Sequence, residues 1–169
     1  MPKAAGFTII ELMFVVALIA VVLGIGAPAL TTMVANNRIS TVASDLLTDF
    51  TFARATAISR SQRVGICASN DQATCNGSSW QQGWMIYVDA NSNNVFDVAT
   101  ETIVRVHDAL PSGLTVTATP PSLDVVFRPS GPADAARSFL VCKTGFIGRT
   151  IAINATGRPL STPTSSNCT

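Results

Sequence analysis

The segment Gly6-Phe7-Thr8-Ile9-Ile10-Glu11-Leu12 opens a long apolar stretch near the start of this chain. A short leader containing Lys3 precedes it, and no charged residue occurs between Glu11 and Arg38. The apolar run, from about Phe7 to Ala35, exceeds the ~20 residues that a helix needs to cross the core of a bilayer. A secretory signal would instead place a shorter apolar stretch before its cleavage site. We therefore predict an anchoring helix that stays on the mature protein.

The same segment resembles the processing motif of type IV pilins and type II secretion pseudopilins. In that family a membrane aspartyl peptidase cuts after the glycine and methylates the new N-terminus. The resemblance implies that residues 1–6 are a prepilin leader, that Gly6 and Phe7 flank the cleavage site, and that Phe7 is N-methylated. Glu11 is then the fifth residue of the mature chain. Pro28 stands where many members carry a helix-bending proline, and we assign both Glu11 and Pro28 to assembly.

Glu11 also has a physical reason to be functional, because a carboxylate within hydrocarbon costs several kcal/mol. A buried charge needs a partner, and the next cation along the helix, Arg38, is many turns away. We expect Glu11 to pair with the N-terminal ammonium of Phe7, in a neighbouring subunit or in its own chain. Such pairing favours a staggered helical bundle. The alternative is a carboxylate that stays solvated in the membrane interface.

The leader lysine suits a cytoplasmic N-terminus. We therefore expect residues 7–35 to form a single-pass transmembrane and assembly helix in the inner membrane, and residues 36–169 to form a globular periplasmic domain.

Cysteine usage agrees with export. The chain has Cys67, Cys75, Cys142 and Cys168, and four cysteines allow three connectivities. We favour Cys67–Cys75, which closes a short loop, and Cys142–Cys168, which ties the C-terminal tail to a strand. The cysteine spacing is not that of a zinc site, and His107 is the only histidine.

The helix is predicted to continue past the membrane, from about Phe7 to about Ser61. Apolar residues recur at spacings of three or four and form an amphipathic stripe. The stripe comprises Ile39, Val42, Leu46, Phe50, Ala53 and Ala57, whereas Asp45, Asp49, Arg54 and Arg60 fall off it.

After Arg63 the pattern changes to short β-rich runs separated by Asn, Gly, Pro and Ser, as expected for antiparallel strands. The runs are 64–67, 84–88, 102–106, 114–117, 123–127, 139–142 and 150–153. The predicted class is α+β, with a pilin fold in which the long N-terminal helix packs on an antiparallel β-sheet domain. The tail, Leu160 to Asn167, has low complexity.

Later segments narrow the resemblance to the GspH/FimT branch of the superfamily. Residues 54–64 look like its helix end, residues 83–89 are similar to its Trp-containing strand, and residues 126–131 resemble its Phe-x-Pro-x-Gly turn. This order implies a minor pilin or minor pseudopilin. Such a subunit helps to initiate or cap a type IV pilus or a type II secretion pseudopilus. Its expected partners are other minor subunits, the major pilin, the inner-membrane assembly platform and the prepilin peptidase.

The stretch from Asp89 to Asp97 raises a calcium hypothesis. Oxygen-bearing side chains at Asp89, Asn91, Asn93 and Asp97 match the start of an EF-hand-like loop. Asn94 can adopt the left-handed conformation that glycine supplies there. The bidentate glutamate is missing at the twelfth place, however, and Glu101 lies one residue late. We favour a polar turn between two strands, with no cofactor.

Charge is unevenly distributed, with a net charge of −4 over residues 89–127 and +4 over residues 128–169. A basic C-terminal region can bind phosphate backbones, and some FimT-type pilins take up DNA through a Gly-Arg-x-Arg segment. Here Gly157 and Arg158 match, but Leu160 replaces the second arginine. DNA uptake in natural transformation, through Arg149 and Arg158, is therefore the alternative function, and a structural role is favoured.

Catalysis finds no support in the sequence. His107 and Asp108 adjoin, but neighbours on a strand point to opposite faces. No nucleophile elbow, zinc spacing or phosphate loop occurs. We expect a protein that is not an enzyme, with His107 at the surface end of a strand.

Overall fold

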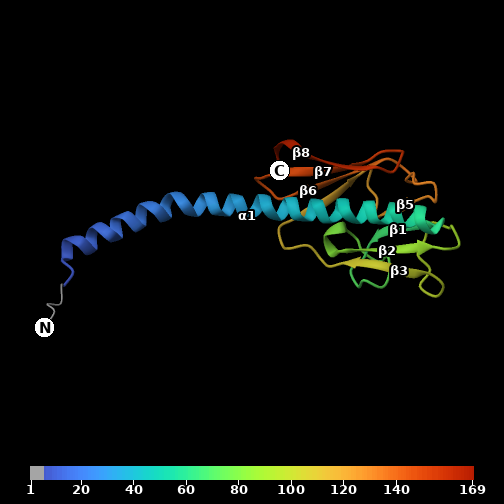
Figure 1. Ribbon diagram of the computed structural model, residues 1–169, viewed down its shortest axis with the longest axis horizontal. Coiled ribbons are helices and arrows are strands. Elements are labelled where there is room, and N and C mark those ends of the chain that lie inside the picture. The colour runs from blue at the N-terminus through green and yellow to red at the C-terminus, as the bar shows by residue number, and fades with distance from the viewer. Residues whose placement is uncertain (1–5) are drawn as a thin grey trace.

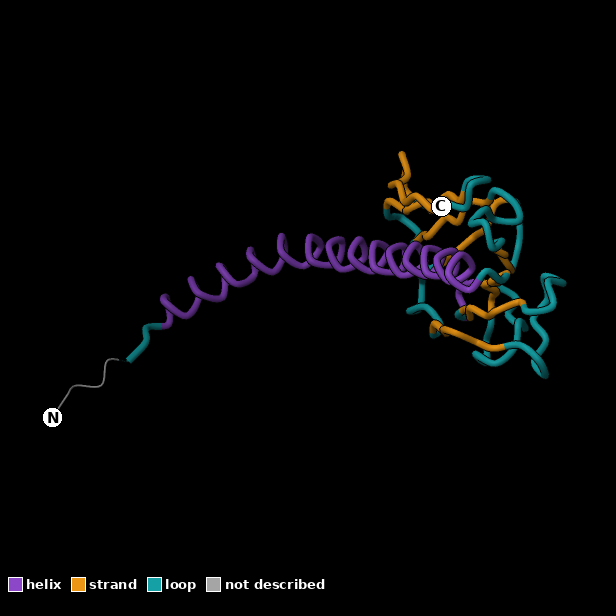
Figure 2. The backbone as a smooth tube through the Cα atoms, turned by 45° about the vertical axis from the view of Figure 1, so that its right-hand side comes forward, coloured by secondary structure: helices purple, strands orange, loops and turns teal. Residues whose placement is uncertain are grey.

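A single long helix, α1 (Ile9–Arg60), begins outside the folded domain and continues into it (Figure 1). The computed structural model describes residues 6–169, apart from the side chains of 25–29. The helix has 52 residues and ends at Ser61, whose left-handed backbone (φ 53°) closes the last turn. The prediction of one helix from about Phe7 to about Ser61 is confirmed, with the first helical residue at Ile9. Figure 2 shows that the helix curves gently where it leaves the domain.

Eight strands follow the helix and form two antiparallel sheets. The first sheet has the order β3-β2-β1-β5 and the second the order β4-β6-β7-β8. Their bounds are β1 (Arg63–Ala68), β2 (Trp84–Asp89), β3 (Thr102–His107), β4 (Thr115–Thr119), β5 (Asp124–Phe127), β6 (Arg137–Cys142), β7 (Ile147–Ile153) and β8 (Pro159–Asn167). A short 3-10 helix, η1 (Trp80–Gln82), precedes β2. The α+β class and the antiparallel pairing are confirmed, and the strands of the β-domain are shared between two sheets.

Both sheets pack on the same helix, so that α1 lies between them (Figure 1). The predicted stripe of α1 is buried throughout, from Ile39 to Ala57. Aromatic rings fill the centre, where Phe50 contacts Phe139 at 4.8 Å and Trp80 contacts Phe139 at 5.1 Å between ring centroids. Removing these apolar surfaces from water is the main force that holds the sheets to the helix.

The C-terminal tail is where the sequence-based expectation was incomplete. Residues 159–167 form β8 and pair along β7, from Ile153 opposite Pro159 to Ile147 opposite Asn167. Proline lacks an N–H donor, so a sequence that contains Pro159 and Pro163 does not have the pattern of a typical strand. Because β8 is an edge strand with one neighbour, it tolerates prolines whose ring side faces away from the ladder.

Candidate assembly surface

The N-terminal helix begins with a capping arrangement that the sequence analysis missed. Thr8 is the N-cap, with extended backbone angles, and its Oγ1 accepts a hydrogen bond from the backbone N–H of Glu11 at 3.3 Å. Thr-x-x-Glu is the sequence pattern of a capping box, and this pattern could have identified the helix start. Glu11 therefore occupies the first turn, where the helix dipole favours a negative charge.

The half-helix before the domain presents its apolar side chains to the outside. Every large apolar residue from Phe7 to Leu23 is at least 42% exposed. The residues are Phe7, Ile9, Ile10, Leu12, Met13, Phe14, Val15, Val16, Leu18, Ile19, Val21, Val22 and Leu23. Contiguous exposed apolar surface of this size marks a membrane or protein contact. The first buried side chain in the described part of the chain is that of Ala35.

Several of the predicted features lie at the limits of the described residues. No helical stretch among the described residues is long and apolar enough to cross a membrane. Leader residues 1–5 lie outside the described part of the chain, as do the side chains of residues 25–29, which include Pro28. Gly6 and Phe7 are described and precede the helix without regular structure. Glu11 is exposed and makes no ion pair within the described residues.

A buried carboxylate fastens the domain to the helix. Asp49 is only 4% exposed; its Oδ2 accepts from Nε1 of Trp84 and its Oδ1 from Arg105, each at 2.8 Å. The Arg105 guanidinium also lies over the ring of Phe52, 3.9 Å from its centroid. The prediction placed Asp49 off the buried stripe, and this was wrong. Its polar partners come from β2 and β3, which the helical pattern alone could not show.

The three segments that resemble the GspH/FimT branch meet at the far end of α1. The Nε of Arg54 donates to the carbonyl of Gly131 at 3.0 Å, which holds the turn after β5 against the helix. Gly131 and Gly157 both have positive φ, and a Cβ on Gly157 would lie 2.1 Å from the Gly131 carbonyl oxygen. The two turns therefore approach as closely as glycine allows.

His107 is the last residue of β3, as expected, but it is not simply a surface residue. Its ring stacks on Trp84 with 3.9 Å between centroids and an interplanar angle of 12°. Nε2 lies 3.7 Å from the carboxylate of Asp45, and Nδ1 lies 2.8 Å from the carbonyl oxygen of Asp108. The side chain of Asp108 instead accepts from Gln72. These contacts join β3 to the helix and to the loop after β1.

Both favoured disulfides are present. Cys67 bonds to Cys75 and Cys142 to Cys168, which leaves no free cysteine among residues 6–169. A bridge of either kind adds ~2–4 kcal/mol by restricting the unfolded chain. The second bridge fixes the end of β8 to β6, and the Cys168 backbone N–H adds a hydrogen bond to the carbonyl of Phe146 at 2.8 Å.

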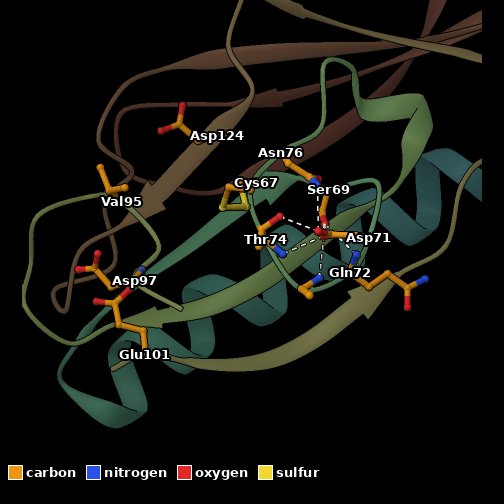
Figure 3. The surroundings of a disulfide bond; sticks show 12 residues. Cys67, Ser69, Asp71, Gln72, Thr74, Asn76, Val95, Asp97, Glu101 and Asp124 are labelled. Atoms are coloured by element: carbon orange, nitrogen blue, oxygen red, sulfur yellow. Dashed lines mark hydrogen bonds between the residues drawn. A yellow bond between two sulfur atoms is a disulfide. The ribbon is translucent and has the colours of Figure 1, made fainter. Parts of the chain in front are cut away.

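The first disulfide closes a loop that is organised by Asp71 (Figure 3). The carboxylate accepts from Ser69 Oγ, Ala73 N–H, Thr74 N–H, Thr74 Oγ1 and Asn76 Nδ2, at 2.7 to 3.1 Å. These donors, the Ala73 amide foremost, hold the pKa of the Asp71 carboxyl far below its usual range. Asp71 therefore remains ionised at every physiological pH.

The loop proposed for calcium is closed by its own hydrogen bonds. The buried carboxylate of Asp89 accepts from the amides of Asn93 at 3.1 Å and Asn94 at 3.0 Å, and Asn94 adopts the expected left-handed conformation (φ 65°). Asp97 Oδ2 accepts from the side chains of Asn91 and Asn93, at 2.5 and 3.0 Å. No group of three or more His, Cys, Asp or Glu side chains in the described region is placed to hold a metal.

Glu101, one place after the EF-hand position, has a local role in the same loop. Its Oε1 accepts from the backbone N–H of Ala90 at 2.9 Å, and its Oε2 from that of Asp97 at 3.1 Å. The carboxylate thus bridges the two ends of the loop. These bonds are what a polar turn between β2 and β3 requires.

The two arginines assigned to DNA do not converge. Arg149 is on β7, half-buried, with its Nε 3.3 Å from the Ser161 hydroxyl. Arg158 is exposed in the turn after β7, beside Pro159, which pairs with Ile153. Four residues of strand separate Arg149 from that end, which is ~13 Å at 3.3 Å per residue. Arg158, in the segment that resembles the DNA-uptake sequence, therefore does not form one compact basic site with Arg149.

Solved structures of pilus and secretion proteins share this fold. The type IV minor pilin FimU of Pseudomonas aeruginosa strain PAO1 is 23% identical, with a TM-score of 0.62, over 79% of this chain and 95% of that chain. The minor pseudopilin EpsH from the type 2 secretion system of Vibrio cholerae is 10% identical, with a TM-score of 0.54, over 76% of this chain and 99% of that chain. No curated protein sequence matches the chain.

Two sequence families match directly. Residues 1–27 match the prokaryotic N-terminal methylation motif, a range that takes in the predicted leader and the N-terminal part of α1. Residues 42–157 match the family described as type II transport protein GspH, and this match takes in most of the domain. With the pilin fold, the methylation motif and the domain in agreement, the chain belongs to the GspH family of pilin-like proteins.

Proposed function

We propose that this protein is a minor pilin or minor pseudopilin that helps to initiate or cap a type IV pilus or a type II secretion pseudopilus. The observation that carries the proposal is the exposed apolar half-helix, Phe7 to Leu23, which lies within the match to the N-terminal methylation motif. Its one acid, Glu11, makes no ion pair among the described residues. Such a surface is stable only when a membrane or other subunits cover it.

The proposed course begins in the inner membrane. The peptidase removes residues 1–6 and methylates Phe7, residues 7–35 anchor the chain by a single pass, and residues 36–169 fold in the periplasm. On assembly, other minor subunits, the major pilin and the inner-membrane platform replace the lipid around the helix. The chain acts as a structural subunit throughout, and no step calls for catalysis or a cofactor.

Recovery of the chain in sheared fibres tests the proposal. The wild-type protein should appear in the sheared fraction, whereas Glu11→Ala should be depleted there and remain in the membrane fraction with both disulfides formed. Ser59→Ala is a matched control, because Ser59 is an exposed α1 residue whose hydroxyl donates to the carbonyl of Thr56 in the same helix. Absence of the wild-type chain from fibres, and unchanged fibre number when its gene is deleted, would refute the proposal.

A further inference from the structure

A small pocket lies on the face of the first sheet that points away from α1. Ile66 of β1 packs in the core with the helix, so the next residue, Cys67, points outward. The pocket has a volume of about 190 Å³ and lies beside the Cys67–Cys75 bridge, between Asp124 and the loop that follows β2. Figure 3 shows this region, with Val95 and Asp124 beside the bridge. Sites for a cofactor or a drug-sized ligand measure ~300–1,000 Å³, so this pocket has room for the end of one side chain.

Tyr87 contributes a buried hydroxyl to the pocket. The residue is only 1% exposed, and a Cβ on Gly65 would lie 2.2 Å from Cζ of its ring. The ring therefore crosses β1 at Gly65 and extends towards β5, which pairs with the other side of β1. The hydroxyl makes no hydrogen bond to any residue that the structure describes. Because buried polar groups nearly always have a partner, this hydroxyl indicates a ligand from outside the chain.

Asp124 adds a charged acceptor to the same pocket. Its Oδ1 accepts from the Ser122 hydroxyl at 2.8 Å and lies 4.0 Å from Nη2 of Arg137. That guanidinium is closer to Asp134, at 2.9 Å. In the described part of the chain, Oδ2 of Asp124 has neither a hydrogen bond nor an ion pair. The pocket therefore offers a carboxylate oxygen and a hydroxyl that are both open to a donor.

The surrounding charge favours a cation in this pocket. Burial raises the pKa of the Tyr87 hydroxyl above its ordinary value, and nearby carboxylates raise it further. The carboxylates are those of Asp89, Asp124, Glu101 and Asp134. Arg63, which contacts the pocket residue Asn94, already donates to the Asn94 side chain at 2.5 Å. The hydroxyl thus stays protonated in a negative field, and that field attracts a cation and repels an anion.

Two aromatic rings favour a flat cation in particular. Tyr87 and Phe96 both line the pocket, with 5.1 Å between their ring centroids and 56° between their planes. A guanidinium stacks on aromatic faces and carries several N–H donors in a rigid fork, whereas an ammonium is a compact, strongly hydrated charge. The end of an arginine side chain can therefore contact a ring while it donates to the hydroxyl oxygen of Tyr87 and to Asp124.

The walls of the pocket are held in place before any ligand arrives. The amide of Asn94 donates to Oδ2 of Asp89 at 3.0 Å, and the amide of Val95 donates to Oδ1 of Asn93 at 2.8 Å. The Cys67–Cys75 bridge fixes the opposite wall. A rigid site loses little conformational entropy when it binds, so even a single side chain can contribute to the affinity of a protein contact.

We propose that this pocket binds the guanidinium of an arginine side chain presented by a partner protein, against the rings of Tyr87 and Phe96 and beside Oδ2 of Asp124. Val95 and Leu123, which are 61% and 45% exposed, then contact the apolar neighbours of that arginine. The inference goes beyond the proposed function, because it concerns a site on the domain and not the helix. It holds for a subunit of either kind of fibre, and its test does not use fibre assembly.

Nuclear magnetic resonance of the detergent-solubilised full chain tests the pocket. Tyr87 is the only tyrosine, so labelling with ¹³C-tyrosine gives ring signals from this site alone. The probe is the peptide acetyl-Ala-Ala-Arg-Ala-Ala-amide, and the matched control peptides carry lysine or the neutral isostere citrulline in place of arginine. We expect a saturable shift of the tyrosine signal with the arginine peptide, several-fold weaker binding of the lysine peptide and no saturable shift with citrulline.

Three variants identify the groups that bind the peptide. Asp124→Asn should weaken binding of the arginine peptide ~5-fold, because a half-exposed ion pair is lost. Phe96→Leu should also weaken it several-fold, because one ring is removed while the tyrosine reporter is kept. Asp108→Asn is the matched control, since Asp108 is exposed, lies outside the pocket lining and loses the same charge. Formation of both disulfides and an unshifted tyrosine signal before titration show that each variant is folded.

Several results would overturn the proposal. A tyrosine signal that does not respond to the arginine peptide would remove the site, and equal binding of the lysine peptide would remove the preference for a guanidinium. Equal weakening by Asp108→Asn and Asp124→Asn would mean that the peptide responds to net charge and not to the pocket. Free arginine that binds as tightly as the peptide would assign the pocket to a small molecule and not to a partner protein.

Discussion

The indole N–H of Trp84 and the carboxylate of Asp49 form a buried hydrogen bond of 2.8 Å between β2 and α1. Trp84 is fully buried, and the imidazole of His107 stacks on one face of its indole ring. Because a buried N–H without an acceptor is costly, this bond fixes how the first sheet sits on the helix. The apolar contacts around it are less selective about position.

Asp49→Ala should destabilise the domain by ~1–3 kcal/mol, because the Trp84 N–H is left buried without an acceptor. Asp49→Asn keeps an oxygen acceptor and should lose less. Urea unfolding of the detergent-solubilised full chain, followed by tryptophan fluorescence, measures both. Equal midpoints for Asp49→Ala and the wild type would show that the bond contributes nothing to stability.

Gly157→Ala should be more damaging than Gly113→Ala, although both glycines have positive φ (75° and 82°). A Cβ on Gly113 would meet nothing within 4 Å, whereas a Cβ on Gly157 would meet the Gly131 carbonyl oxygen at 2.1 Å. The left-handed backbone costs alanine ~1–2 kcal/mol at either site. The difference between the two midpoints of thermal unfolding isolates the close approach, and no difference would mean that the turns move apart freely.

Asp71→Asn should make the Cys67–Cys75 bridge easier to reduce, because the loop loses a charged acceptor for five donor groups. Dithiothreitol titration with thiol alkylation and mass analysis measures it, and Cys142–Cys168 serves as an internal standard. A parallel rise in the reduction of both bridges would indicate general unfolding instead.

The same carboxyl predicts a pH dependence. Its pKa is lowered on folding, so its contribution is complete above the unfolded value of ~3.9 and is lost only as pH falls towards the lower folded value. Amide exchange of Ala73 and Thr74 should therefore stay protected from pH 7 to below ~4 after correction for intrinsic rates. Loss of protection near neutral pH would contradict this.

The helix was predictable because a continuous apolar run, from about Phe7 to Ala35, leads directly into a periodic stripe from Ile39 to Ala57. A stripe at three- and four-residue spacing indicated its buried face, and most strands stood out as β-rich runs between turn residues. The burial of Asp49 was not predicted, because burial of a charge depends on partners from distant strands, here Trp84 and Arg105. Strand β8 was not predicted, because an edge strand need not be apolar or free of proline. Division into two sheets depends on which strands pair, which local patterns do not specify.

Gly6→Val should block removal of the leader, because a branched side chain does not fit where a peptidase accepts a minimal one. Intact mass of the membrane-extracted chain distinguishes a start at Phe7 from one at Met1. Thr8→Ser, which keeps the capping hydroxyl, should be processed normally. Wild-type chain that begins at Met1 in a cell with active prepilin peptidase would contradict the processing claim.

DNA binding should be weak at physiological salt. Arg149 and Arg158 stand apart in the structure, and few phosphates can be neutralised together, so little counterion release is available. Duplex gel-shift titrations of the detergent-solubilised chain at two salt concentrations measure affinity and its salt slope. Arg149→Gln with Arg158→Gln should change neither. Tight binding that Arg158→Gln abolishes would instead make DNA uptake the leading function.

The placement of α1 between both sheets has a mechanical consequence. A load on the outer end of the domain passes directly into the helix, through Arg54 and the packed residues from Ile39 to Ala57. The strands run beside this shaft and do not have to carry the tension through their ladders. The domain should therefore stay folded on its helix under pulling. The first contacts to break should be those between the helix and neighbouring subunits.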